Sequence, residues 1–224
     1  MILTNILVSF SRAYKVRYHI RFCTLCYISD MNDQLEFGQL ILEYVKQLRE
    51  ESERGAVIVS AALMDEALEE LIKAKLVPSP EKKDELFIGA YAPLDNFSAK
   101  IDFAYRIGII GFSIRASLHL LRKLRNDFAH SALQMSFDSS SVRDRIRELF
   151  KLNKELLDVL WDVAKKENNP YIAEITGGID SKQGIDYLVE IAGWRSIFQI
   201  LVSLISASLR QHYGDIEPLK SLAD

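Results

Sequence analysis

Apolar residues recur at three- and four-residue spacing along much of the 224-residue chain, which is the spacing of a helix buried on one face. Between Met31 and about Val77 the pattern runs in two stretches, on either side of the charged segment at 49–54. Pro78 and Pro80 end the second stretch, because proline lacks the backbone donor that a helix interior needs. We therefore predict two helices here, with the apolar first half of the second one deep in the core.

Two further helices are predicted at about 97–110 and 114–129. Asp95 or Asn96 is suited to cap the first, since a short side-chain oxygen can accept a hydrogen bond from the free amides of a first turn. Ser113 is predicted to cap the second helix in the same way. Leucines and a phenylalanine recur along 114–129 and give it an apolar stripe that should face the core.

The C-terminal third predicts two more helices, at about 142–166 and 185–212, joined by a linker at 167–184. Ser141, with Asp144 three residues later, resembles a capping box at the start of the first. The last helix contains an apolar run that is too short to span a bilayer and is flanked by arginines. It is therefore predicted to be a buried core or interface helix, and no membrane association is expected.

Together these elements predict an all-α fold, with a single helical bundle of about five to six helices at 31–166. The apolar helix at 185–212 is expected to pack on that bundle or on a dimer partner, and 213–224 to form a tail. Ten glycines and five prolines are few for this length, which argues against an all-β sandwich or barrel. Residues 1–30 are basic and poor in acids, and we expect an N-terminal extension outside the fold, with a mitochondrial-type presequence as the alternative.

Charge is spread unevenly along the chain. The formal net charge of −3 gives no bulk attraction to nucleic acid. Residues 31–110 carry 15 acids and 9 bases, whereas residues 111–160 carry 9 bases and 6 acids. The middle of the chain therefore has a modest basic bias. The lack of a disulfide framework fits a reducing compartment, so a cytoplasmic protein is expected.

Signatures of common catalytic sites are missing from the sequence. There is no glycine-rich phosphate loop, no Gly-x-Ser-x-Gly elbow and no His-Glu-x-x-His pair. Cys23 and Cys26 have the spacing of a redox or metal pair, but no second pair accompanies them, and incidental thiols are the favoured interpretation. The acids at 65–70 lie at helical spacing, yet a di-metal site would need Glu-x-x-His partners, so a solvated face is favoured. No metal and no cofactor are expected.

The stretch LRKLRNDFAHS at 121–131 concentrates polar groups of distinct chemistry at the end of an apolar-striped helix. Its Arg-x-x-x-x-His spacing, with an asparagine directly after the arginine, resembles the motif of HEPN domains, helical modules many of which cut RNA. The resemblance implies a metal-independent mechanism in which Arg125 stabilises a phosphate and His130 moves a proton. The candidate binding residues are Arg122, Arg125, Asn126, Asp127 and His130.

Helix geometry limits this motif. Five positions of an α-helix correspond to a rotation of about 500°, so Arg125 and His130 point about 140° apart. They could meet on one phosphate only if the helix ends before His130 or if a second subunit contributes, and HEPN proteins are usually dimers. The favoured interpretation is structural: His130 suits a helix C-terminus, and Arg125 and Asp127 would be partners of the acidic helix at 65–70.

A longer series of segments resembles the mannitol operon repressor family in order and spacing, over about residues 35–160 and more loosely near 195–210. The strongest piece combines a loop, a cap and an amphipathic helix. The resemblance implies an all-helical fold and a role in repressing a sugar-alcohol operon. The segments are ERGAVIVSAALMDEALEELI, APLDNFSAKIDFAYRIGII, LLRKLRNDFAH and FDSSSVRDRIREL.

The leading hypothesis is a non-enzymatic transcriptional regulator of the mannitol repressor type, acting through protein contacts or weak DNA binding. The basic helices at 114–129 and 142–154 form no convincing helix-turn-helix pair, so a protein partner is favoured at least as strongly as direct operator binding. The alternative is a metal-independent HEPN-type ribonuclease or RNA-binding module that uses Arg125 and His130. A homodimer is expected, and nucleic acid is a candidate ligand.

Overall fold

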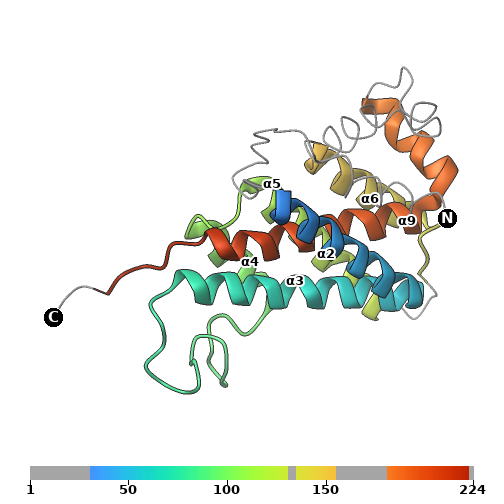
Figure 1. Ribbon diagram of the computed structural model, residues 1–224. Coiled ribbons are helices and arrows are strands. Elements are labelled where there is room, and N and C mark those ends of the chain that lie inside the picture. Colours follow the sequence, from blue (N-terminus) through green and yellow to red (C-terminus); the bar gives the residue numbers. More distant parts are fainter. Residues whose placement is uncertain (1–30, 131–134, 155–180, 222–224) are drawn as a thin grey trace.

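The computed structural model describes residues 31–130, 135–154 and 181–221. Within these ranges the chain is all-helical and contains no strand, as the apolar spacing predicted. Figure 1 shows the helices stacked as a bundle, with a long loop projecting from one side. The α-helices are α2 (Met31–Glu50), α3 (Glu53–Lys75), α4 (Phe97–Arg106), α5 (Phe112–His130), α6 (Ser140–Leu152) and α9 (Ser181–His212), and the 3-10 helix η1 (Tyr213–Asp215) follows α9.

The predicted domain boundaries can be compared with the structure only in part. The expected extension at 1–30 and residues 155–180, which hold most of the expected linker, lie outside the described residues. The last helix begins at Ser181, four residues before the predicted start at 185. The segment after His212 is tied to α3, because Leu219 N donates to Lys75 O over 2.8 Å and Lys75 Nζ donates to Glu217 O over 3.0 Å.

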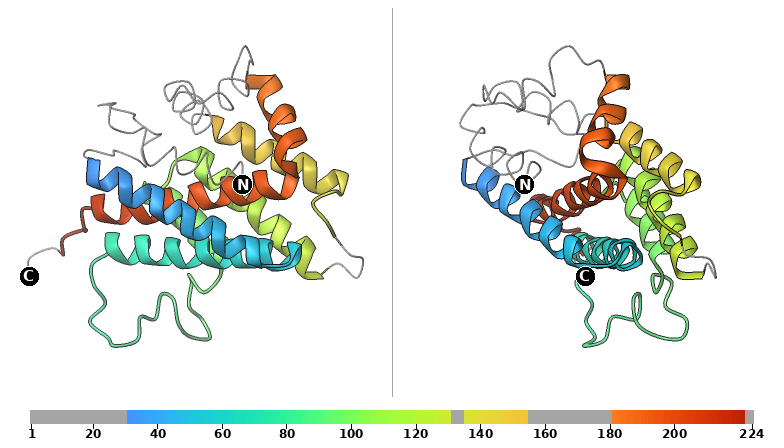
Figure 2. Two further views of the ribbon diagram at one scale, coloured as in Figure 1. Left: turned by 45° about the vertical axis from the view of Figure 1, so that its right-hand side comes forward. Right: turned by 90° about the vertical axis from the view of Figure 1, so that its right-hand side faces the viewer.

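The apolar half of α9 forms the centre of the bundle. Every residue from Leu201 to Leu209 is buried, and α9 packs against α2, α3 and α6. Figure 2 shows it in the middle, with α2 and α3 on one side and α5 and α6 on the other. The C-terminal helix therefore packs on the bundle of its own chain.

The same helix has the length and composition of a membrane span, so the prediction that its apolar run is too short is wrong. Its surroundings, however, are those of a core helix. An 18-residue stretch within Ala192–Asp215 has a mean hydropathy of 1.3, and 72% of this stretch is buried inside the bundle. A lipid-facing helix would expose its apolar side chains. Burial by α2, α3 and α6 thus accounts for the composition of α9.

Two polar side chains of α9 fix the C-terminal end of α2. Gln199 Nε2 donates to Leu48 O over 2.8 Å. The Arg195 guanidinium donates to Glu51 O and to Arg49 O. The last carbonyls of a helix have no partner within the helix, so these bonds satisfy groups that burial would otherwise leave unpaired.

Glycines with positive φ end or bend two helices where the apolar pattern continues. Gly193 interrupts α9 at φ 76° and ψ 157°, so the prediction of one continuous helix over 185–212 is wrong at this point. Gly108 has φ 75°, and α4 ends at Arg106 instead of the predicted 110. Residues with a Cβ are strained in this region of backbone space, whereas glycine is not.

The predicted helix over 142–166 is also wrong in its continuity. α6 ends at Leu152, and Asn153 is its C-cap. The Asn153 side chain donates to Leu149 O over 2.7 Å and to Ser117 Oγ of α5 over 2.9 Å. An asparagine that bonds to the preceding turn competes with the helix, which explains the break.

One of the three capping predictions is confirmed, and the other two are wrong. Asn96 caps α4, and its Oδ1 accepts from Ala99 N over 3.0 Å, as predicted. Ser113 is not the cap of α5, because the helix begins at Phe112. Ser141 is not a cap either: Ser139 holds that position in α6, without a side-chain hydrogen bond.

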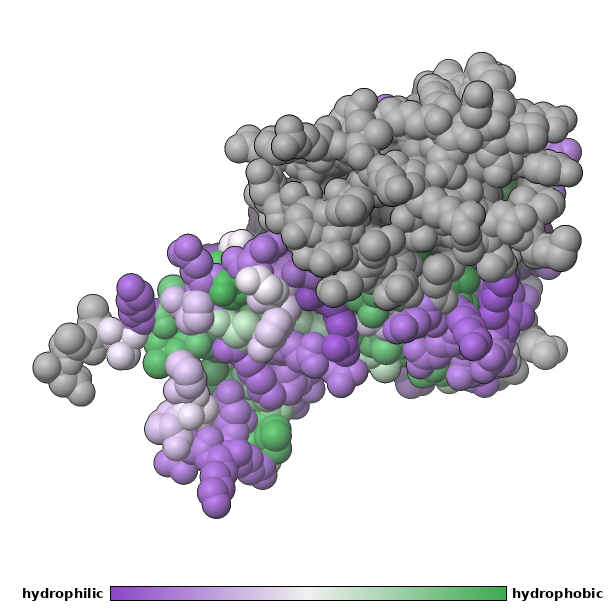
Figure 3. Space-filling view, in the orientation of Figure 1, coloured by the Kyte–Doolittle hydropathy of each residue, from purple (hydrophilic) through white to green (hydrophobic). Residues whose placement is uncertain are grey.

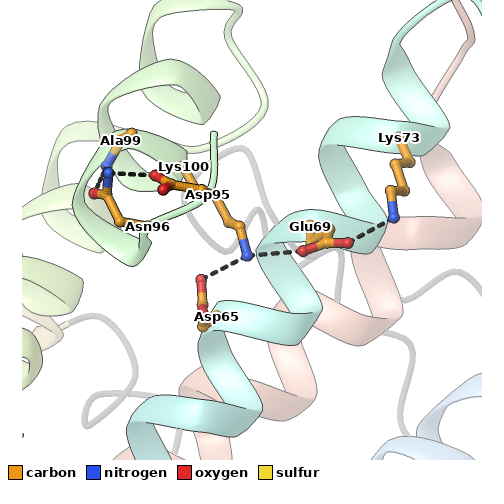
Figure 4. A network of polar contacts seen from close by, with 7 residues as sticks. All are labelled: Asp65, Glu69, Lys73, Asp95, Asn96, Ala99 and Lys100. Atoms are coloured by element: carbon orange, nitrogen blue, oxygen red, sulfur yellow. Dashed lines mark hydrogen bonds and ion pairs between the residues drawn. The ribbon is translucent and has the colours of Figure 1, made fainter. Parts of the chain in front are cut away.

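A buried lysine joins α4 to α3 (Figure 4). Lys100 is 5% exposed, and its Nζ lies 2.7 Å from Glu69 Oε2 and 3.0 Å from Asp65 Oδ1. Glu69 also accepts from the more exposed Lys73. Two of the acids predicted to form a solvated face therefore neutralise a buried cation, which corrects that expectation for Asp65 and Glu69.

The first half of α3 is buried on one face only. Ala56, Val57, Ala61 and Met64 are buried, as predicted, but Ile58 is 38% exposed. The prediction that this half-helix lies deep in the core is therefore wrong on its outer side.

The loop between α3 and α4 projects from the bundle, and Figure 3 shows largely hydrophilic side chains at its tip.

Replacing Gly193 with alanine should destabilise the fold. The observed φ and ψ lie in a region that is almost restricted to glycine, so Gly193→Ala should lower the free energy of unfolding by about 1–3 kcal/mol. Urea denaturation followed by circular dichroism measures this. Gly214→Ala is the matched control, since Gly214 has no positive φ and a Cβ there meets no atom within 4 Å. Equal stability of Gly193→Ala and the control would show that the kink is not fixed by backbone geometry.

The Lys100 cluster should give the fold a defined pH dependence. Burial opposes charge on both partners, but the Glu69–Lys100 contact outweighs it, so the pKa of Glu69 lies below 4.5 and that of Lys100 above 10.5. The stabilisation from Glu69 is present above pH 4.5 and is lost as the pH falls through its folded pKa. The stabilisation from Lys100 is present below pH 10.5 and is lost as the pH rises through its folded pKa.

Lys100→Met should therefore lower the free energy of unfolding at pH 7 by about 2 kcal/mol, less than for a fully buried pair because the acids are about one-third exposed. It should also flatten the loss of stability between pH 5 and pH 3. Lys73→Met removes the exposed contact to the same Glu69 and should cost at most about 0.5 kcal/mol. An unchanged acid limb in Lys100→Met would contradict the assignment.

Candidate functional site

The predicted site residues all lie on the last three turns of α5. The helix is amphipathic, and Leu121, Leu124 and Phe128 bury its inner face. Arg122, Arg125, Asn126 and Asp127 are half-buried beside that face, and His130 is exposed. The buried stripe thus fixes the direction of each polar side chain.

The structure does not bring Arg125 and His130 together within one chain. α5 remains helical through His130, which is its last described residue. The two side chains therefore stay about 140° apart around the helix axis. The helix does not end before His130, so the first way in which the two side chains could meet on one phosphate is absent. The second way, through another subunit, stays a prediction.

Asp127 has a structural partner on the neighbouring helix. Its Oδ2 accepts a hydrogen bond from Arg145 Nη1 of α6, in a short charge-assisted contact. The predicted pairing of Arg125 and Asp127 with the acids at 65–70 is not observed: Asp127 is bound by α6, and Arg125 has no ion pair within the described residues. Asp127 therefore joins α5 to α6.

The structure adds a residue that the motif did not include. Arg54, in the first turn of α3, donates from Nη2 to Ala129 O over 2.7 Å, although 75 positions separate the two. Figures 1 and 2 show the start of α3 beside the last turn of α5. A guanidinium at a helix C-terminus is favoured by the partial negative charge of the free carbonyls.

Four cations at this end of the bundle have no carboxylate partner. Within the described ranges, no ion pair involves Arg54, Arg122, Lys123 or Arg125. The Nε of Arg122 is shielded from solvent and has no hydrogen-bond partner. By contrast, all three arginines of α6 are paired with aspartates: Arg143 with Asp138, Arg145 with Asp127, and Arg147 with Asp186.

A second polar group lies on the outer faces of α4 and α5. Asp102 Oδ1 accepts from Arg115 Nε over 2.8 Å and lies 3.1 Å from His119 Nε2. Burial raises the pKa of Asp102. The hydrogen bonds and charges of Arg115 and His119 lower it by more than burial raises it, so the pKa lies below 3.8. The carboxylate therefore stays ionised and orients the imidazole ring of His119.

The described ranges contain no group of three metal-ligating side chains close enough to hold an ion. Cys23 and Cys26 lie outside the described residues. The geometry of the α5 end supports contacts to anions, since its free groups are guanidinium, ammonium, amide and imidazole.

Comparison with known proteins gives a likeness in fold. No family model matches the sequence, and no curated protein matches it. A chain of the X-ray structure of the MtlR–HPr complex from Escherichia coli superposes with a TM-score of 0.50 at 16% sequence identity. The match covers 77% of this chain and 99% of that one. The likeness supports the resemblance to the mannitol repressor family at the level of the fold.

Arg54 and Arg125 should differ in their effect on stability. Arg54→Met removes the hydrogen bond to Ala129 O and should lower the free energy of unfolding by about 1 kcal/mol. Arg125→Met should change it by less than about 0.5 kcal/mol, because Arg125 has no polar partner in the described part of the chain. Urea titrations of both variants make the comparison, and a larger loss in Arg125→Met would show that its packing had been undervalued.

Proposed function

We propose that this chain is a transcriptional regulator of the mannitol repressor type that acts through contacts with a protein partner. The observation that carries the proposal is the fold likeness to a chain from the MtlR–HPr complex, which extends over 99% of that chain. A protein of the HPr kind is the first candidate partner. A homodimer is part of the proposal, and light scattering coupled to size-exclusion chromatography tests it.

The pairing of the α6 arginines argues against α6 as a helix that reads an operator directly. Each of Arg143, Arg145 and Arg147 binds an aspartate. Arg143 and Arg147 also lie over the Trp194 ring, at 5.9 and 4.6 Å from its centroid. A recognition helix needs arginines that are free to reach base edges, and these have intramolecular partners.

Isothermal titration calorimetry of the chain with HPr from the same organism tests the proposal. We expect saturable binding. A concentration of about 100 µM of each protein is high enough to detect a weak, transient complex, so the absence of any heat of binding there would contradict the HPr assignment. A gel shift with operator DNA is the second arm. A specific complex that survives physiological salt would replace the protein contact with direct DNA binding, because non-specific phosphate contacts weaken steeply with salt.

The ribonuclease hypothesis is tested separately with RNA in the presence of a chelator. We expect no cleavage by the wild-type chain, since α5 keeps Arg125 and His130 on different faces. Cleavage that is lost in both Arg125→Ala and His130→Ala would establish the HEPN-type activity instead. Loss in only one variant would assign the reaction to a different pair of residues.

A further inference from the structure

The second half of the connection between α3 and α4 is a compact loop at 86–94, called the presenting loop below. Asp84, just before it, holds its first turn: Asp84 O accepts from Phe87 N over 3.1 Å, and Asp84 Oδ1 accepts from Leu86 N over 3.0 Å. Leu94 N donates to Leu86 O over 2.9 Å and brings the two ends together. The backbone of the loop is therefore fixed by its own hydrogen bonds.

Apolar side chains anchor the presenting loop to the bundle. Phe87, Ala92 and Leu94 are each at most 7% exposed. Phe87 and Leu94 belong to the same buried cluster as the helices, and the Lys73 ammonium of α3 lies 4.7 Å from the centre of the Phe87 ring. A loop whose ends are close and whose own side chains pack inward is an Ω-type loop, a class that frequently carries function.

Between these anchors, the loop turns large side chains outward. Tyr91 is 97% exposed, Ile88 49% and Leu86 40%. Tyr91 is the third residue of the turn in which Ala92 N donates to Gly89 O over 3.3 Å. Figure 3 shows hydrophobic side chains on one flank of the projecting loop. Burial in the fold therefore does not explain why a tyrosine stands at this position.

The charge and the shape of the loop indicate the kind of partner. Residues 81–85, directly before it, carry three acids and two lysines, so neither nucleic acid nor an anionic lipid surface is attracted there. The loop projects from the bundle (Figure 1), and two convex tips facing each other in a symmetric dimer would bury little surface. A different protein with a concave apolar surface fits both features.

We propose that the presenting loop inserts Tyr91, flanked by Ile88, into an apolar pocket of a protein partner. The assignment rests on the proposed function, in which that partner is a protein of the HPr kind. Tyrosine provides a large contact area with only two rotatable side-chain bonds, so little conformational entropy is lost when it binds. The hydrogen-bonded backbone lowers this loss further, because the loop is ordered before the partner arrives.

The test compares variants of the loop in the calorimetric titration with HPr from the same organism. Tyr91→Ala should weaken binding by at least about tenfold, as for an anchor at the centre of an interface. Its melting temperature should match the wild type, because the ring is exposed. Tyr213→Ala is the matched control: it removes the same side chain from η1, where it is 53% exposed, and should change the affinity by less than about twofold.

A second pair of variants tests the fixed backbone. Asp84→Ala removes the side-chain acceptor for Leu86 N and should weaken HPr binding by about threefold to fivefold, because the loop must then be ordered as it binds. Asp84→Asn keeps an oxygen at the same position and should restore most of the affinity. Equal affinities of the two variants would contradict the role of this hydrogen bond in positioning Tyr91.

The outcomes separate the presenting loop from the regulator proposal. If the wild type binds HPr and Tyr91→Ala binds equally well, or if Tyr213→Ala loses as much affinity, the loop is overturned and the regulator proposal stands. If the wild type does not bind HPr, both are overturned. Light scattering on Tyr91→Ala covers the remaining occupant, since conversion of a wild-type dimer to a monomer would assign the loop to the contact between two copies.

Discussion

Burial of the apolar half of α9 is the interaction on which the other contacts depend. Its side chains fill the space between α2, α3 and α6, and each fully buried leucine or isoleucine contributes about 1.5–3 kcal/mol. α3, which lines this core, also packs directly against α5, and that contact sets the position of Arg54 against Ala129. The polar groups at the bundle end are therefore held by the apolar packing of the helices that carry them.

The apolar spacing was sufficient to predict the helices, because periodicity reports which face is buried and six helices obey it. It could not locate the breaks at Gly193 and Asn153. A glycine or an asparagine inside an amphipathic pattern leaves the pattern intact, and only the backbone angles or a side-chain hydrogen bond reveal the interruption. The caps show the same limit, since Asn96 reached an amide and Ser113 did not.

The sequence placed all the candidate groups on one helix, and the structure adds a contact to that helix from Arg54 of α3. Arg125 and His130 are close in the chain and point apart, because five residues do not complete whole turns of a helix. Arg54 is distant in the chain and reaches the same turn, and no local pattern around 49–54 predicts that contact. A short motif read along one helix can therefore miss the cation that tertiary packing supplies.

The hydrogen bonds from Arg195 and Gln199 to the end of α2 bear on how the protein is made. They join positions about 150 residues apart, so the helix that begins the described fold is completed by a helix that is synthesised much later. At the usual pace of synthesis, about 5–20 residues per second, the sides of α2 and α3 that face α9 stay uncovered for roughly 7–30 seconds. A nascent chain in that state is a natural client for chaperones, and translation halted before α9 would yield a product prone to aggregation.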